Sequence, residues 1–193
     1  HSRIGNNVFA INKYFDASKP SILLNSHHDT VKPNPQYTKN PFTPIVENGK
    51  LYGLGSNDAG GCLVSLIAAF LYFYEKEKLK YNIVIAATAE EEISGTDGIE
   101  ELLLHEAFIE QTLGAFTGKG VCAIVGEPTQ MNLAIAEKGL LVLDCTTHGK
   151  AGHAAREEGE NAIYKALKDI EWFSNFQFPK LSETLGPVKM SVT

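Results

Sequence analysis

Short apolar runs alternate with longer apolar or periodic segments in the first part of the chain. Each short run is bounded by polar or turn-forming residues, which is typical of a buried strand, and the runs lie at residues 8–12, 21–25, 82–88 and 121–125. Helices are predicted from about 62 to 76 and at 99–113. The first is apolar on every face, so we expect it to pack on several sides. This order predicts an α/β fold, a mainly parallel sheet with helices on both faces.

The pattern changes near residue 136. The elements predicted there are strands and one amphipathic helix, at 132–137, 140–147, 160–173 (the helix) and 188–193. The strand at 140–147 alternates in part, as expected for a sheet with one wet face. We therefore predict a domain at 1–135 and a smaller α+β domain at 136–193. No Met begins the chain and its end falls inside a predicted strand, so both domains are expected to be incomplete.

Composition and charge narrow the classes of function. The chain has 193 residues, 44% of them apolar, which allows a sizeable core. Its net charge is −6. No basic run exceeds two residues, which argues against a nucleic-acid partner. The apolar stretch 62–74 is shorter than the roughly 20 residues that span a bilayer, and the N-terminus has no apolar signal region, so no membrane association is expected.

Three cysteines lie inside apolar runs and show no metal-binding or redox spacing; they are Cys62, Cys122 and Cys145. We expect reduced core thiols, because buried cysteine behaves as a small hydrophobe. An odd number of unpaired thiols is typical of a cytoplasmic protein.

Polar residues follow the ends of the predicted strands in the first part of the chain; they are His27, Asp29, Asp58, Glu90, Glu91, Glu92 and Glu127. Because ligands bind at the carboxyl ends of the strands in open α/β sheets, we expect these side chains to meet. One imidazole with several carboxylates suits zinc or a neighbouring divalent ion. His27 and Asp29 share a face of an extended segment, so Asp29 can orient the imidazole, whereas His28 points away.

Two of these features have a plain structural alternative. Taken alone, the acidic run at 90–92 is equally compatible with a solvated loop that leads into a helix. Asp58 taken alone is compatible with an N-cap, since it precedes a predicted helix. The common position of these residues at strand ends favours the metal site.

Four motifs together resemble a known enzyme family. They lie at 24–31, 52–61, 88–95 and 126–129, in the order and rough spacing of the co-catalytic dinuclear zinc amidohydrolases and peptidases. That family includes acetylornithine deacetylase, succinyl-diaminopimelate desuccinylase, aminoacylase and glutamate carboxypeptidase. The resemblance covers nearly the whole chain, and acetylornithine deacetylase is the member it suggests most.

The resemblance implies two Zn²⁺ ions, with Co²⁺ able to substitute. By it, His27 and Glu127 bind one ion, Glu92 binds the second and Asp58 bridges them. Glu91 would then be the general acid/base. Family members also carry a cis peptide bond after the bridging Asp, which here is the bond between Asp58 and Ala59.

Two further roles follow from the same resemblance. Asp29 would orient His27, and His153 would reach the active site of a partner subunit from the smaller domain. That domain would be a ferredoxin-like lid through which a homodimer forms.

The sequence also departs from the family pattern. Glu90 stands where Asp is usual, and we expect it to make a backbone or orienting hydrogen bond. Ala59, Gly60 and Gly61 replace the commoner Met-Lys-Gly. The family's second-zinc histidine near the C-terminus has no counterpart among the later histidines, which are His105, His148 and His153. We expect a longer protein to supply it.

The function implied is hydrolysis of the amide bond of an N-acyl amino acid, of the N-acetylornithine type, in arginine biosynthesis. Two alternatives stay open at this point. One is a dipeptidase or carboxypeptidase that acts on short peptides with the same chemistry. The other is a non-catalytic module that binds metal or dimerises.

Overall fold

The structure is a computed structural model that describes the chain except residues 114–121, 154 and 157. It divides into two compact units, His1–Met131 and Asn132–Thr193, and each is described by itself. Residues 114–120, between the predicted helix and the strand predicted at 121–125, and the first residue of that strand lie outside the described residues.

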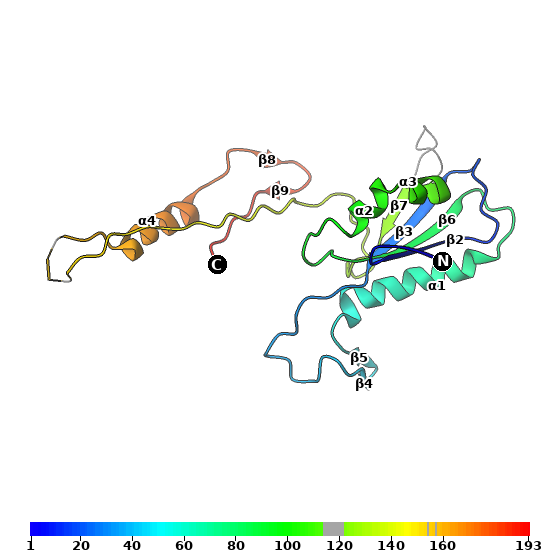
Figure 1. Ribbon diagram of the computed structural model, residues 1–193, viewed down its shortest axis with the longest axis horizontal. Helices are drawn as coiled ribbons and strands as arrows, with labels where there is room; N and C mark the ends of the chain where they lie inside the picture. The colour runs from blue at the N-terminus through cyan, green and yellow to red at the C-terminus, as the bar shows by residue number, and fades with distance from the viewer. Residues whose placement is uncertain (114–121, 154, 157) are drawn as a thin grey trace. The chain divides into compact units, whose positions relative to one another are not determined.

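A five-stranded sheet forms the centre of the first unit (Figure 1). In spatial order its strands are β1 (Ser2–Ile4), β2 (Asn7–Ile11), β6 (Asn82–Thr88), β3 (Ser21–His27) and β7 (Cys122–Val125). β6, β3 and β7 are parallel, whereas β1 pairs antiparallel with β2 and β2 with β6. The sheet is therefore mixed. A mainly parallel sheet was the wrong expectation at this edge, because an apolar run indicates burial but not strand direction.

Helical segments cover both faces of the sheet, as predicted; they are α1 (Cys62–Tyr74), α2 (Ile99–Leu104), α3 (Glu106–Phe108) and η2 (Ile109–Leu113). Alternate side chains of a strand point to opposite faces. Leu24 of β3 therefore packs with Phe70 of α1, whereas Leu23 packs on the other face in a cluster that contains Leu102 and Phe108. The helix predicted at 99–113 is interrupted at His105, which has extended backbone angles.

Among the described residues of the first unit, α1 packs on one side, which corrects the expectation that it is surrounded. Phe70 is its buried side chain, and Leu66 and Ala69 are partly buried against the sheet. The outer side carries exposed apolar residues at helical spacing; they are Val64, Ile67 and Leu71. The apolar residues on every face of this helix did not reveal which of its faces would pack against the sheet.

The helical stretch that includes α1 is longer than the apolar run alone. Ser56–Tyr74 spans 19 residues with a mean hydropathy of 1.3, and 11% of its best window is buried. By length and composition alone, this stretch reaches the size of a membrane-spanning helix. Asp58 and Ala59 have non-helical backbone angles, so its first part is not regular α-helix.

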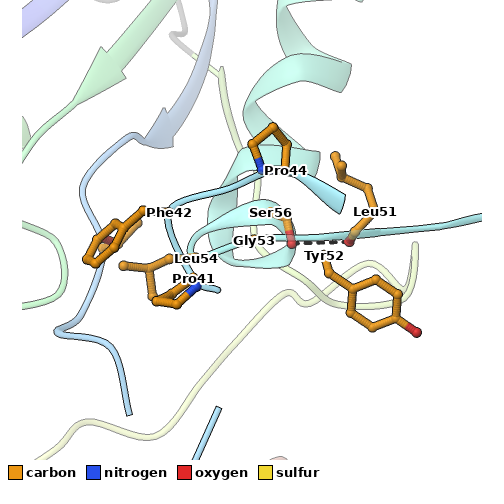
Figure 2. A pocket seen from close by; sticks show the side chains of 9 residues that line it. Pro41, Phe42, Pro44, Leu51, Tyr52, Gly53, Leu54 and Ser56 are labelled. Atoms are coloured by element: carbon orange, nitrogen blue, oxygen red, sulfur yellow. Dashed lines mark hydrogen bonds between the residues drawn. The ribbon is translucent and has the colours of Figure 1, made fainter. Parts of the chain in front are cut away.

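A hairpin of β4 (Ile45–Glu47) and β5 (Lys50–Tyr52) precedes this stretch. Its turn residues, Asn48 and Gly49, have φ of 52° and 75°, as a tight two-residue turn requires. Beside the hairpin lies an open cavity of about 390 Å³ (Figure 2). Its lining is mostly apolar and comprises Thr30, Pro41, Phe42, Pro44, Leu51, Tyr52, Gly53, Leu54 and Ser56.

The second unit contains one long helix, α4 (Ala162–Asn175), close to the predicted range 160–173. Asn161 caps it, because its side-chain oxygen accepts hydrogen bonds from the backbone N–H groups of Ile163 and Tyr164. The strands here are β8 (Leu181–Ser182) and β9 (Gly186–Pro187), which pair with each other.

The strands predicted at 132–137, 140–147 and 188–193 are not present. Their apolar side chains lie exposed instead, Leu133 at 88% and Leu140 at 89%. A strand needs a partner for its backbone hydrogen bonds, and no described strand pairs with these segments. The predicted ferredoxin-like lid therefore stays a prediction.

The three cysteines are free thiols. Cys62 is half-buried, whereas Cys122 and Cys145 are exposed, so the expectation of core burial was wrong for those two. Both belong to segments whose apolar side chains are also exposed, such as Ile124 of β7 at 49%.

Candidate metal centre

Three parallel strands end at the same edge of the sheet, so the residues that follow them lie there. β3 ends at His27, which is in register with Thr88 at the end of β6. β7 is in register with the same part of β3, with Val125 opposite Asn25. The residues just past these strands therefore share that edge; they are Asp29, Glu90, Glu91, Glu92 and Glu127.

A short irregular segment brings the remaining carboxylate. η1 (Ser56–Gly61) begins after Gly55, whose φ of 72° favours glycine, and the Gly60 N–H donates to the Gly55 carbonyl at 2.8 Å. Asp58 lies inside this turn with extended angles, and its peptide bond to Ala59 is cis, as the family resemblance predicts. No side chain caps η1 or α1, so the N-cap interpretation of Asp58 is wrong.

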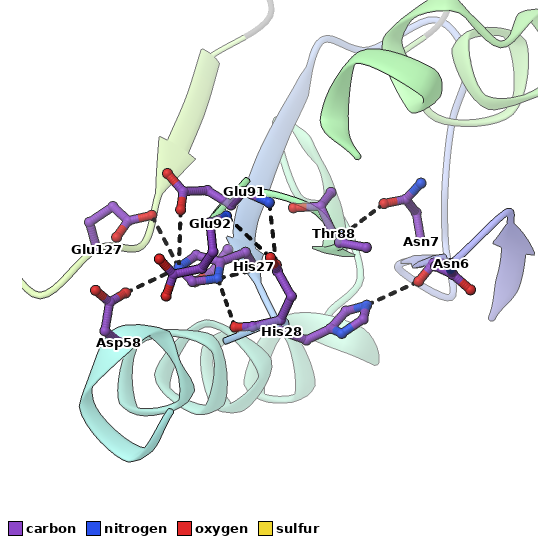
Figure 3. A network of polar contacts seen from close by, with 12 residues as sticks. Asn6, Asn7, His27, His28, Asp58, Thr88, Glu91, Glu92 and Glu127 are labelled. Carbon is purple, nitrogen blue, oxygen red and sulfur yellow. Dashed lines mark hydrogen bonds and ion pairs between the residues drawn. The ribbon is translucent and has the colours of Figure 1, made fainter. Parts of the chain in front are cut away.

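His27 lies at the centre of the carboxylates (Figure 3). Its side chain is 1% exposed, and its Nε2 is 3.1 Å from Oδ1 of Asp58. The same nitrogen is 3.9 Å from Oε2 of Glu91 and 3.9 Å from Oε1 of Glu127. One ligand atom from each of His27, Asp58 and Glu92 lies within 4.8 Å of the others.

Asp29 connects the imidazole to the acidic run. Its Oδ1 lies 3.4 Å from Nδ1 of His27, and its carbonyl oxygen lies 3.1 Å from the same nitrogen. The carboxylate also accepts from the backbone N–H groups of Glu91 at 3.4 Å and Glu92 at 3.2 Å. Asp29 thus fixes both the ring and the segment that carries two of the carboxylates.

Glu90 has a different task from its two neighbours. Its φ is 60°, and its Oε2 accepts a hydrogen bond from the Asp97 N–H at 3.1 Å, the backbone contact that the sequence predicts. The N–H of Gly95 donates to the Glu90 carbonyl at 2.9 Å. The acidic run is therefore part of an internally bonded loop rather than only a solvated one.

The electrostatics of the cluster are dominated by negative charge. Burial lowers the pKa of His27, but the hydrogen bond to Asp58 and the charges of Glu127 and Glu91 outweigh burial, so the pKa lies above its usual 6.5. Burial raises the pKa of Glu127 above its usual 4.5, and Glu91, Asp58 and Glu92 raise it further, whereas His27 opposes the rise. Each shift reports carboxylates crowded around one imidazole.

The donor set fits a divalent cation. Among the described residues, no Lys or Arg forms an ion pair with Asp58, Glu91, Glu92 or Glu127. Clustered carboxylates without a counter-charge are unfavourable, and a bound cation removes that cost. Zinc lies about 2.0–2.2 Å from imidazole and carboxylate ligands, so two ligands of one ion are at most about 4.4 Å apart. The distances from His27 to Asp58 and Glu127 meet that limit.

The structure separates the predicted residues into two groups. His27, Asp29, Asp58, Glu91, Glu92 and Glu127 come together in the first unit. His153 belongs to the second unit, where it is exposed and its Nδ1 accepts from the Ala155 N–H at 3.1 Å. His28 is exposed and its Nε2 lies 3.0 Å from the Asn6 carbonyl oxygen, away from His27 as predicted.

Sequence reasoning missed Asn7. Its side chain is fully buried and bonds to the segment that carries the acidic run. No spacing rule places a residue of β2 beside residues about 90 positions away. Only the antiparallel pairing of β2 with β6 reveals the contact.

One protein family and one solved structure are similar to the chain. Residues 23–183 match peptidase family M20/M25/M40, and the chain belongs to that family. The crystal structure of human carnosine dipeptidase 1 is similar over 75% of this chain, with 21% sequence identity and a TM-score of 0.44. The chain spans 28% of the length of that protein.

Proposed function

We propose that the chain carries the metal centre of a hydrolase that cleaves a linear amide bond. The observation that supports this most is the meeting of one buried imidazole with carboxylates from three strand ends and η1. His27 and Glu127 would bind one Zn²⁺ ion, Glu92 a second, and Asp58 would bridge them. Co²⁺ would substitute for Zn²⁺, since imidazole and carboxylate suit both.

Two such ions would polarise the substrate carbonyl and lower the pKa of a water to about 7. Glu91 is suited to take the proton of that water, because its carboxylate faces the cluster, 3.9 Å from His27, and is 56% exposed. It would then pass the proton to the leaving amine, a step typically worth about 10²–10⁴ in rate. Asp29 keeps Glu91 in place through the backbone N–H and keeps His27 in one orientation.

The proposed substrate is an N-acyl amino acid of the N-acetylornithine type, as in arginine biosynthesis. This choice rests on the sequence motifs, since membership of a peptidase family is compatible with acyl amino acids and with short peptides alike. The proposed assembly is a homodimer through the domain at 136–193, in which His153 acts in the partner's site.

The test is Glu91→Gln in the purified full-length protein, assayed for zinc content and for release of acetate from N-acetylornithine. We expect about two zinc ions per chain in both proteins and a loss of at least about 10²-fold in kcat in the variant. Glu100→Gln makes the same chemical change at an exposed position of α2 and should retain full activity.

Each outcome decides a different part of the proposal. Unchanged turnover in Glu91→Gln would exclude Glu91 as the proton-transfer group. A wild-type protein with fewer than about two ions would exclude the two-metal mechanism. Cleavage of dipeptides with no cleavage of acyl amino acids in a parallel panel would replace the proposed substrate.

A further inference from the structure

The antiparallel pairing of β2 with β6 puts the start of β2 beside the metal centre. Val8 is in register with Ala87, so Asn7 lies next to the carboxyl end of β6. Asn7 precedes the residues that match the peptidase family, which begin at 23. It is nevertheless 0% exposed, and Figure 3 shows it on the side of the site opposite Asp58.

The Asn7 side chain makes three hydrogen bonds, all to residues between Ala89 and Glu101. Its Oδ1 accepts from the Ala89 N–H at 3.0 Å. Its Nδ2 donates to the Asp97 carbonyl at 2.8 Å and to Oε2 of Glu101 at 2.9 Å. One buried amide therefore joins the residue just before the acidic run to residues just after it, and both of its polar atoms are satisfied.

These bonds close residues 89–97 into a loop. Gly98 completes the closure, because a Cβ there would lie 2.2 Å from the Ala89 carbonyl oxygen. Glu90 bonds to Asp97 within the loop, and Asp29 holds its middle through the N–H groups of Glu91 and Glu92. The loop is thus held at its ends by Asn7 and in its middle by Asp29.

We propose that Asn7 is a positioning residue that sets the places of Glu91 and Glu92 by clamping the two ends of this loop. The inference rests on the proposed function, because it concerns the metal affinity of the site. Asn7 contacts the side chain of neither Glu91 nor Glu92, so it acts through the backbone. Residues that orient ligands typically change metal affinity about 10–100-fold when they are replaced.

The chain offers a matched control in Asn12, just past the other end of β2. Asn12 is 2% exposed, and its Oδ1 accepts from the Ile83 N–H of β6 at 2.9 Å. It therefore also joins β2 to β6 through a buried amide, but at the end of β6 away from the acidic run. A general loss of stability should appear in variants of both residues, whereas a loss of metal affinity should appear only at Asn7.

The test measures Co²⁺ binding to the chelator-treated protein by visible absorption, together with the thermal midpoint of unfolding. The variants are Asn7→Ala and Asn12→Ala, with Asn7→Ser and Asn12→Ser as second variants that keep a neutral polar group but are too short to join both ends of the loop. We expect Co²⁺ affinity to fall at least about tenfold in both Asn7 variants and to stay within about twofold of wild type in both Asn12 variants. We also expect altered absorption bands for bound Co²⁺ only at Asn7.

The outcomes separate this inference from the proposed function. A wild-type protein that binds no Co²⁺ overturns both. Wild-type binding with unchanged affinity in Asn7→Ser overturns the clamp alone and leaves the metal centre standing. Equal losses in the Asn7 and Asn12 variants also overturn it, since they indicate a general effect of stability. If Asn7→Ala does not fold, the comparison of the two Ser variants decides.

Discussion

A single buried imidazole faces most of the negative charge in the site. His27 has Asp58, Glu91 and Glu127 within 3.9 Å of Nε2, and Asp29 on its other nitrogen. These partners favour the protonated ring, which is why its pKa lies above 6.5 although burial opposes the charge. A metal ion needs the neutral ring, so protons and metal compete for the same nitrogen.

This competition predicts how metal binding depends on pH. Because the pKa of His27 is raised, Co²⁺ affinity should begin to fall at a pH above that of an ordinary histidine, and it should fall further as the pH decreases. Metal titrations in buffers of different ionisation enthalpy, from about pH 8 to about pH 5.5, should also show release of a proton on binding near pH 7. An affinity that stays constant over this range would contradict the role of His27 as a ligand.

The functional residues at the strand ends could be predicted from the sequence. The hydrogen bonds by which distant residues hold them in place could not. The period of two along an extended segment correctly separated His27 and Asp29 from His28. Asn7 gave no such signal, because its partners are set by strand pairing. Asp58 was ambiguous in sequence, since only the absence of a capping hydrogen bond from its side chain shows that it is not a cap.

At the scale of elements, the junction between β6 and α2 determines where the acidic run lies. Ala89 and Gly98 are the two ends of this junction, and their backbones approach too closely for a side chain at 98. Gly98 is buried and precedes the first turn of α2, so the helix cannot move away without loss of the Leu102 packing. A larger residue must therefore strain the loop.

Gly98→Ala should destabilise the protein by about 1–3 kcal/mol, the usual range for a residue forced into a packed site. The reason is contact with a backbone oxygen, which cannot rotate away as a side chain could. Urea unfolding of the metal-free protein measures the change. Gly139→Ala is the control, because nothing lies within 4 Å of its added Cβ, and it should leave the midpoint unchanged. Equal midpoints for wild type and Gly98→Ala would show that the loop can relax.

The central strands and α1 of the first unit were predicted well, and so was α4 although it has no buried residue, whereas three strands predicted in the second unit are not present. β3, β6 and α1 pack against one another, and their predicted ranges agree with the structure. The apolar segment 140–147 has strand-like alternation, yet its residues are exposed and unpaired. Pattern indicates which side chains should be buried, but a strand forms only where another strand supplies hydrogen bonds.

At the scale of the whole molecule, the residues proposed to act together belong to two units, each described by itself. The metal centre lies in His1–Met131, whereas His153 lies in Asn132–Thr193. His153 is exposed, and its Nδ1 accepts a local hydrogen bond from the Ala155 N–H, which is compatible with the proposed action of its Nε2 in a partner subunit. A donor placed there would stabilise a developing oxyanion, which typically contributes about 10²–10³ in rate.

Action across a dimer interface makes a quantitative prediction for mixed subunits. Glu91→Gln and His153→Ala should each be nearly inactive alone. After equal mixing and exchange of subunits, about half of the dimers contain one of each, and one site in each mixed dimer has both groups intact. Activity should therefore recover to about a quarter of the wild-type value, measured as amide hydrolysis at equal total protein.

The matched control for this mixture is Glu91→Gln combined with the double variant Glu91→Gln, His153→Ala. No site in that mixture has Glu91, so it should stay inactive whatever subunits exchange. If His153 serves its own chain instead, the original mixture should also stay inactive, because Glu91 and His153 then never occur in one intact site. Recovery in the first mixture alone therefore assigns His153 to the partner's site. Recovery in neither mixture excludes His153 from the partner's site.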